Sequence, residues 1–566
     1  MILSPVLAWG LLAIGLGPST VAAQHFPITG VKVADGAEVP LRLNVNDLYS
    51  QAGPQWYIMI QPNGTTSTGR KRLIQKFRDL YLRALQSLQN KDASDPLSYF
   101  QVSGIHGLPY IEWEHGGPYR ATGWAGYCPH GESIFLPWHR PFVLVFEQLL
   151  VAEAQKIAET YPVAHRSRYR DAAIKLRAPF WDWSRDSNVP PCTVPAQLTV
   201  NVPDGEGLKR ITINNPLQTY TYPQKARSGQ FGAFTDQRTT SRCPPPDRYP
   251  DSANERLGRI GLKQYTYDAF TLSQTFSDFA NTREDGGIGI EQIHNTIHWD
   301  AGCGGQFLDS NTAAFDGLFM LHHSHVDRLW AYGSAINPAV SVFDYRYYGQ
   351  SRYSTPQNTI ISPDSPLEPF YDDHDSYWTS RKVASIKGMG YTYEGLEYWR
   401  KSPEQLRNDA IRIINDLYAP DDGGMERRSK TGHSHTRFFA KIQLDRSQVE
   451  RPCTVTIFVD GKPAGKVVAM QLPEHGTLHG RVSVDREVQG AFATTPSSNG
   501  TVSSIEHLVE MEIRKSDGTV IPLNSVPSLK LTLEEVNVTR KKSKAELPKA
   551  GDKTKLHASV RDHHHE

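Results

Sequence analysis

Histidines are the residues of this chain whose number and spacing best suit metal chemistry. Neutral imidazole is a common metal ligand, and a site built only from histidines favours copper or zinc over magnesium or calcium. The candidates form two sets of three, with His106, His130 and His139 in the first and His294, His298 and His323 in the second. Three imidazoles per ion, present twice, predict a coupled pair of copper ions that binds dioxygen.

A predicted helix around residues 288–299 carries part of the second set. His294 and His298 are four residues apart, which places both rings on one face of that helix. Glu291 and Asn295 have the same spacing on an adjoining face. A carboxylate and an amide there could orient the ligands or hold a water molecule.

The other histidines need further elements to bring them together. His323 lies in a segment of helical periodicity, residues 318–334, and His139 opens a predicted helix over residues 137–161, with His130 in the loop before it. For any one of these histidines taken alone, the simpler explanation is an ordinary histidine whose ring is hydrogen-bonded and binds no metal. Their joint occurrence among aromatic and proline residues favours a metal site.

Composition limits the classes of protein that this chain can represent. With 566 residues, 39% of them hydrophobic, the chain is long enough for two or more domains with a large core. The 61 basic and 60 acidic residues give a net charge of +1. There is thus no basic surplus of the kind that binds nucleic acid, and we expect no such partner.

The N-terminus has the features of a secretory signal. Residues 6–16 are apolar but too short to span a bilayer, and the small residues at 21–23 suit cleavage before Gln24. We therefore expect a signal peptide at residues 1–23 and a secreted protein with no membrane segment after its removal. Three sequons support secretion and predict glycosylation at Asn63, Asn499 and Asn537.

Hydrophobic periodicity divides the mature chain into parts. Residues 24–400 carry amphipathic helices and long loops, and residues 401–436 combine a helix with a polar, glycine-rich linker. Beyond the linker, alternation of period two predicts antiparallel strands over residues 437–540, and the charged tail at 541–566 is expected to be disordered. The expected fold class is a mainly α domain followed by a C-terminal antiparallel β-sandwich.

The five cysteines give an odd count for a secreted chain, so at least one of them is not in an intrachain disulfide. Cys192 and Cys243 flank a proline-rich stretch within residues 187–250, which we expect to be a surface insertion, and these two could form a disulfide. Cys128 precedes His130 by two residues, which singles it out among the cysteines.

Around the histidines the sequence resembles the fungal tyrosinases, the polyphenol oxidases of the type-3 copper family. The resemblance rests on residues 104–110, 127–131, 135–140, 294–298 and 314–330 and on Tyr391 and Tyr393. In this pattern the ligand in the His322–His323 pair is the second histidine, and His322 and His325 are supporting or incidental. The strand-rich part resembles, more loosely, the C-terminal shielding domain of secreted members.

The resemblance implies a four-helix bundle whose six histidines hold two copper ions, with dioxygen as the oxidant. It implies hydroxylation of monophenols to o-diphenols and oxidation of o-diphenols to o-quinones, as in melanin synthesis. The substrates would be phenolic small molecules or peptidyl tyrosine. It also implies a thioether between the sulfur of Cys128 and the ring of His130, although Cys128 could instead form a disulfide.

Two further positions bear on which phenols are used. In the resemblance, Glu291 and Asn295 hold the water that takes up the phenol proton, which favours monophenol hydroxylation. The alternative is that Glu291 is an ordinary acid on a helix face. Ser310 falls at the position of a gate residue, six before Asp316, and its small side chain would leave the entrance open.

The C-terminal domain is implied to act as an intramolecular inhibitor that keeps the enzyme as a zymogen. Phe492 is the candidate plug over the coppers, with packing inside its own domain as the alternative. The dibasic pair Arg427 and Arg428 in the linker predicts a processing site, which would release an active domain ending around residues 400–428.

The sequence leaves three alternative functions open. A catechol oxidase without monophenol activity would use the same ligands, as would a reversible oxygen carrier of the hemocyanin type. A zinc protein would use histidines without redox chemistry.

Overall fold

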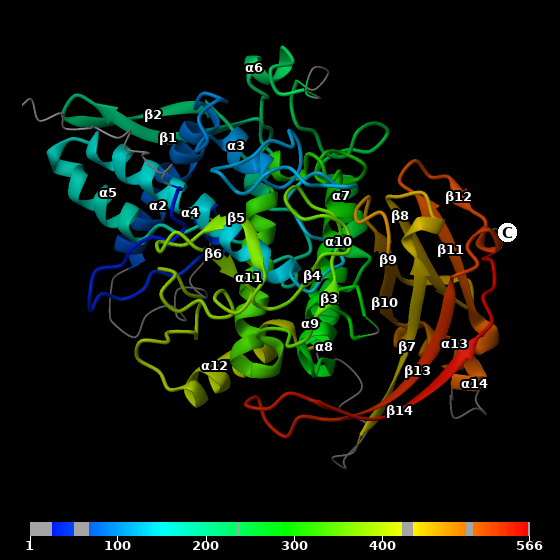
Figure 1. Ribbon diagram of the computed structural model, residues 1–566. Coiled ribbons are helices and arrows are strands. Elements are labelled where there is room, and N and C mark those ends of the chain that lie inside the picture. Colours follow the sequence, from blue (N-terminus) through cyan, green and yellow to red (C-terminus); the bar gives the residue numbers. More distant parts are fainter. Residues whose placement is uncertain are drawn as a thin grey trace, which may run out of the picture.

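The computed structural model describes residues 25–49, 67–232, 234, 238–284, 286–420, 434–493 and 502–563. A helical part and a strand-rich part lie side by side, as expected from the sequence (Figure 1). The expected signal peptide, Asn63, Asn499 and the dibasic pair Arg427 and Arg428 lie outside the described residues.

Four helices form the centre of the helical part: α2 (Ser67–Gln89), α4 (Phe135–Glu159), α10 (Ile290–Gly302) and α11 (Phe319–Ile336). α4 is buried along most of its length because apolar residues cover nearly its whole surface. It packs against α2 and α11, and α11 in turn contacts α10. These helices begin and end close to the limits expected from periodicity.

Shorter elements surround this centre. The helices are α1 (Val45–Tyr49), α3 (Tyr99–Gly104), α5 (Val163–Lys175), α6 (Gln224–Arg227), α7 (Asp251–Gly258), α8 (Leu262–Leu272), α9 (Phe276–Ala280) and α12 (Pro403–Tyr418). The antiparallel pairs are β1 (Gln197–Asp204) with β2 (Gly207–Asn214), β3 (Tyr347–Tyr348) with β4 (Ile360–Ile361), and β5 (Pro366–Tyr371) with β6 (Tyr377–Thr379).

The segment expected to be a surface insertion, residues 187–250, is partly core. It contributes the β1–β2 hairpin, and its aromatic residues Tyr222 and Phe234 are fully buried. Both rings pack against Phe315, which lies just before α11. The polar composition of the segment conceals these few aromatic anchors.

The C-terminal part is an antiparallel β-sandwich, which confirms the expected class. One sheet has the strand order β10 (Thr477–Ser483), β7 (His435–Asp445), β13 (Lys530–Thr539), β14 (Lys549–Ala558), and the other has β12 (Val520–Ile521), β11 (Val509–Lys515), β8 (Cys453–Val459), β9 (Lys462–Ala469). Alternate residues of both sheets fill the layer between them, among them Val455, Ile457, Leu531 and Leu533.

The expectation that the tail at 541–566 is disordered is wrong. β14 pairs with β13 from Lys549 opposite Thr539 to Ala558 opposite Leu531. Further along, the ring of His563 stacks on Phe458 at 3.7 Å. Backbone pairing needs no apolar side chains, and lysines are common on edge strands, so the charged composition did not reveal this strand.

The proposed disulfide between Cys192 and Cys243 is also wrong. Cys243 is bonded to Cys303, and Cys192 is free and buried. The Cys243 amide donates to the carbonyl of Gly302 at 2.9 Å, which holds the loop against the end of α10. The bond therefore ties the 187–250 segment to the helix that carries His294 and His298.

The two parts dock through α10. Gln292 exchanges two hydrogen bonds with the backbone of Arg481 in β10, at 2.8 and 2.9 Å, and Asp300 pairs with Lys466 of β9 at 2.6 Å. Trp299 forms a small apolar cluster with residues that include Met470. One side of α10 thus faces the bundle, and the other holds the β-sandwich.

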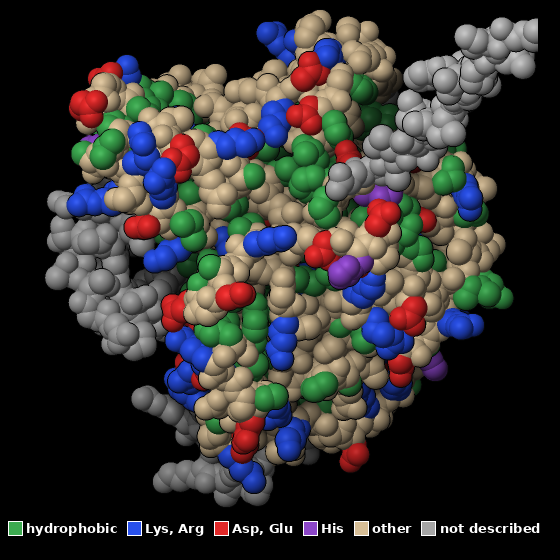
Figure 2. Space-filling view, turned by 60° about the vertical axis from the view of Figure 1, so that its left-hand side comes forward, with side chains coloured by type: hydrophobic (Ala, Val, Ile, Leu, Met, Phe, Trp, Pro, Cys, Tyr) green, Lys and Arg blue, Asp and Glu red, His purple; other side chains and the backbone are tan. Residues whose placement is uncertain are grey.

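The surface is mixed in charge. Figure 2 shows Lys and Arg side chains interspersed with Asp and Glu over one face of the molecule, in line with the net charge of +1. Among the helices that the structure describes, none combines the length and apolarity needed to cross a bilayer.

Candidate metal centre

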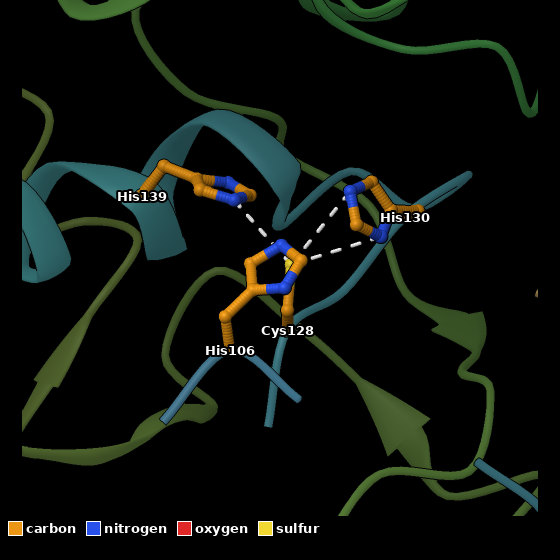
Figure 3. Close-up of side chains that lie close together, drawn as sticks. All are labelled: His106, Cys128, His130 and His139. Carbon is orange, nitrogen blue, oxygen red and sulfur yellow. Dashed lines mark hydrogen bonds between the residues drawn. The ribbon is translucent and has the colours of Figure 1, made fainter. Parts of the chain in front are cut away.

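The first histidine set meets around a cysteine. His106 follows α3, His130 lies in the loop before α4, and His139 is on α4, with the sulfur of Cys128 between their rings (Figure 3). The possible ligand atoms of these four residues all lie within 4.8 Å of one another, and all four side chains are buried.

The second set meets between α10 and α11. The Nε2 atom of His294 lies 3.1 Å from that of His298 and 3.3 Å from that of His323. His322, which the sequence analysis did not assign as a ligand, belongs to the same cluster. The sequence-expected ligands are thus brought together as two groups of three, with one extra residue in each group.

Hydrogen bonds fix which nitrogen faces each centre. The Nδ1 atoms of three of the rings contact backbone carbonyls: His106 that of Ser310 (3.0 Å), His139 that of Phe135 (2.8 Å) and His298 that of Phe307 (2.5 Å). A carbonyl only accepts, so Nδ1 carries the proton and Nε2 is left bare for a metal. The buried Nε2 of His106 has no protein partner.

These contacts make the second cluster difficult to explain without a cation. The Nδ1 of His294 contacts the amide oxygen of Asn295 at 2.9 Å, so its Nε2 is bare, like that of His298. Two bare nitrogens 3.1 Å apart repel each other unless a cation or a proton lies between them. Burial lowers the pKa of His298 to about 4, which opposes the proton. The residues present fit a bound metal ion.

The two clusters form one site. The rings of His139 and His323, one from each cluster, stack with centroids 4.1 Å apart and an angle of 11°. His130 and His294 lie 5.8 Å apart across the same boundary. Ions held by the two triads would therefore be close enough to share a small ligand.

The comparisons with known proteins agree with this geometry. Residues 96–332 match the family model described as the common central domain of tyrosinase. The chain is 34% identical over 356 residues to polyphenol oxidase 2 of Agaricus bisporus, covering 61% of this chain and 63% of that protein. It is 32% identical over 429 residues to tyrosinase of Neurospora crassa, covering 69% of this chain and 58% of that protein.

Residues 96–332 therefore form a tyrosinase central domain. The chain spans about three fifths of the length of these curated relatives. A solved structure of recombinant mushroom tyrosinase has a similar fold, with a TM-score of 0.76 at 22% identity, covering 95% of this chain and 99% of that one. The likeness extends over both parts of the molecule.

A buried ion network joins the ligand helices of the tyrosinase fold. Asp327 on α11 accepts from Arg140 on α4 at 2.5 Å and from Arg42 at 3.0 Å. Tyr391 and Tyr393, the pair noted in the sequence, each donate a hydroxyl proton to the same carboxylate at 2.7 Å. Asp327 is four residues after His323, and Arg140 adjoins His139, so the network fixes the distance between the two triads.

Cys128 is a free, buried thiol, and its sulfur lies 3.7 and 3.8 Å from the two nitrogens of His130. It is also 3.3 Å from the Nε2 of His139. This proximity is compatible with a thioether to His130, which stays a prediction. The alternative of a disulfide finds no partner among the described cysteines, because Cys192 and Cys453 are also free.

Glu291 and Asn295 both touch the ligand set. One oxygen of Glu291 accepts from the amide of Gly131 at 2.5 Å, next to His130, and the other accepts from the amide and hydroxyl of Thr282. Burial raises the pKa of Glu291, and these hydrogen bonds oppose the rise. Asn295 orients His294. The role of this pair in holding a water molecule remains untested.

The gate candidate lies in the helical part and the plug candidate in the C-terminal part. Ser310 is buried, and its backbone carbonyl positions His106, while its hydroxyl has no partner. The backbone of Phe492 lies in α13 (Asp485–Ala493), a helix that contacts β7, β8 and β9 of its own domain, and its side chain lies outside the described residues. Another short helix, α14 (Val502–Ile505), follows.

Other residues of the site were missed by sequence reasoning. Phe135 precedes His139 by four residues, so helix geometry could have identified its carbonyl as the partner of that ring. The carbonyls of Phe307 and Ser310 lie in loops, where spacing gives no such signal. Arg446 of the C-terminal part reaches Thr282 at 3.1 Å, and no local pattern indicated that contact.

Proposed function

We propose that this protein is a copper-dependent phenol oxidase that hydroxylates monophenols to o-diphenols and oxidises o-diphenols to o-quinones with dioxygen. The observation that carries the proposal is the pair of facing histidine triads, whose bare Nε2 atoms converge to 3.1 Å in the second triad. Neutral nitrogen ligands without a carboxylate suit copper, which would supply the redox chemistry when bound.

The six proposed ligands are His106, His130, His139, His294, His298 and His323. Carbonyl acceptors hold three of these rings rigidly, so the protein presents an ordered donor set before any ion arrives. Copper is favoured over zinc because two adjoining three-nitrogen sites suit an oxidant shared between two ions. A zinc protein has no evident use for this pairing.

Glu291 is the proposed acceptor of the phenol proton. Burial raises the pKa of its carboxyl, which brings it nearer to that of a useful general base. Its oxygens already accept from Gly131 and Thr282, so it is held in place beside His130. Asn295, fixed against His294, would hold the second side of a bridging water.

We also propose that the C-terminal part is an intramolecular inhibitor. Gly131, next to His130, has φ of +63°, and a Cβ added there would lie 3.0 Å from Arg446 and 3.2 Å from Pro473. A cavity of about 90 Å³ beside His130 is lined on one side by the residues from Leu472 to His475. We propose that residues 472–475 cover this side of the site, while Phe492 stays a candidate plug.

The remaining biological expectations stay proposals. Secretion and cleavage at Arg427–Arg428 are predicted from the sequence, and a zymogen form and the use of small phenols or peptidyl tyrosine are implied by the family resemblance. Of the three sequons, Asn537 is described, and it lies exposed on β13, where a glycan could be accommodated.

A catechol oxidase is the second candidate, because the same ligands would serve it. Assays of copper-loaded protein with a monophenol and with an o-diphenol separate the two, and we expect turnover of both. In Glu291→Gln we expect monophenol turnover to fall by about 10²-fold or more, with o-diphenol oxidation much less affected. Turnover of o-diphenol alone would indicate a catechol oxidase, and reversible oxygen binding without turnover would indicate a carrier.

A further inference from the structure

His322 lies inside the second cluster without an obvious role. Its ring stacks on His294 with centroids 4.9 Å apart and an angle of 22°, and it meets His298 edge-on at 4.9 Å. It is fully buried, and its Nε2 has no hydrogen-bond partner among the residues that the structure describes. A nitrogen of this ring lies within 4.8 Å of the ligand atoms of the other three histidines.

A single hydrogen bond sets the protonation pattern of this ring. The indole Nε1 of Trp183 lies 3.0 Å from the Nδ1 of His322, and both side chains are fully buried. An indole N–H can only donate, so Nδ1 must be the acceptor and carries no proton. In the neutral ring the proton is then on Nε2, where it blocks the lone pair that a metal would need.

Two of the proposed ligands in this cluster, His294 and His298, have the opposite pattern. In His298 the Nδ1 donates to the carbonyl of Phe307, which leaves Nε2 bare. Two rings in one cluster are therefore set to opposite tautomers by their partners, one by a carbonyl that only accepts and the other by an indole that only donates. Trp183 thus sets the tautomer of His322, whereas the Nδ1 of His323 has no such donor among the described residues.

We propose that Trp183 is a positioning residue that keeps His322 from becoming a fourth ligand, and so preserves an open position on the second metal for dioxygen. The inference rests on the proposed dicopper function. A site closed by four protein ligands suits a structural metal, whereas a reactive metal needs a vacant position. Without the indole N–H, the proton of His322 is free to move to Nδ1, and Nε2 becomes a ligand.

Azide binding to the oxidised, copper-loaded protein tests this, because azide needs an open position and its complex is measured by absorption. In Trp183→Phe we expect azide to bind about tenfold more weakly or worse, since His322 competes for the position. The double variant Trp183→Phe/His322→Phe should regain the parent affinity. Trp181→Phe is the matched control, because Trp181 is equally buried but donates to the carbonyl of Asn188 at 3.0 Å.

Copper content separates the possible failures. His322→Phe alone should retain as much copper as the parent, and loss of one equivalent in that variant would show that His322 is a ligand and overturn the inference. Unchanged azide affinity in Trp183→Phe, with normal copper content, would overturn the inference and leave the proposed function standing. A parent protein that binds no copper would overturn both.

Discussion

At the scale of single residues, the site is a set of imidazole rings. The fold, and not closeness in the sequence, sets the hydrogen-bond partners of these rings. Carbonyls from Phe135, Phe307 and Ser310 each turn one bare nitrogen toward the centre. These contacts fix the orientation of the rings, so the ligand set is preorganised. The same burial that preorganises the rings also keeps them neutral.

Because the buried rings stay neutral, the folded protein loses stability in acid. Burial lowers the pKa of His139 to about 3 and that of His298 to about 4, against about 6.5 in an unfolded chain. Between these values the unfolded state binds protons that the folded state refuses, so stability is complete above the unfolded pKa and is lost as the pH falls. We expect the unfolding temperature of the metal-free protein to drop between about pH 6.5 and pH 4, measured by calorimetry.

The slope of stability against pH identifies the histidines that cause the loss of stability in acid. In His298→Gln the free energy of unfolding should change less steeply with pH, by about 1.4 kcal/mol per pH unit at most. His374→Gln is the control substitution, because the side chain of His374 is 85% exposed. An unfolding temperature that is constant over this range would contradict the assignment of neutral, buried rings.

At the scale of elements, α4 and α11 are held in register by the carboxylate of Asp327. It accepts from Arg42 and Arg140 inside the core. These guanidinium groups lower the pKa of Asp327, while burial opposes the shift. Removing the charge leaves Arg140 without its carboxylate partner and Arg42 with Glu147 alone.

We expect Asp327→Asn to lower the free energy of unfolding by about 3–5 kcal/mol, because breaking a buried ion pair leaves uncompensated charge. Urea denaturation measures this. Asp364→Asn, which breaks the exposed pair with Arg381, should leave the free energy of unfolding close to that of the parent. Equal effects of the two substitutions would show that the buried network does not hold the helices together.

The elements also show what sequence can and cannot predict. The ligand helices α10 and α11 follow from apolar periodicity, because a buried helix leaves that trace in the sequence. The strand β14 and the Cys243–Cys303 bond depend on which distant backbone lies alongside, and no local pattern records that. The six histidines were found from spacing, but their carbonyl partners in loops were not.

At the scale of the whole molecule, the β-sandwich sits on the outer side of α10, the helix that carries two of the proposed ligands (Figure 1). Arg437 of β7 makes two hydrogen bonds of 2.9 Å to Asp268 of α8, which adds a second anchor. Arg446 contacts Thr282 at 3.1 Å and lies beside Gly131, and burial lowers its pKa to about 10. Docking therefore places a buried cation beside the first histidine triad.

We expect Arg446→Met to raise the activity of the intact protein, because the C-terminal part loses its hydrogen bond to Thr282. A buried hydrogen bond from a charged group contributes about 1.5–3 kcal/mol. Its loss should therefore raise the population of an open form, in which the C-terminal part has left the site, by roughly ten- to hundredfold. Arg514→Met is the control, since Arg514 pairs with Glu512 inside the β-sandwich. Equal activity of Arg446→Met and the parent would argue against inhibition through this contact.

The most direct measurement is the metal content of the protein after loading with copper, taken together with its absorption spectrum under oxygen. The two facing triads predict about two copper ions per chain and a new band that appears on oxygenation and disappears when oxygen is removed. His294→Ala should lose copper and the band together. A content well below two ions per chain, or full occupancy by zinc with no band, would contradict the dicopper site.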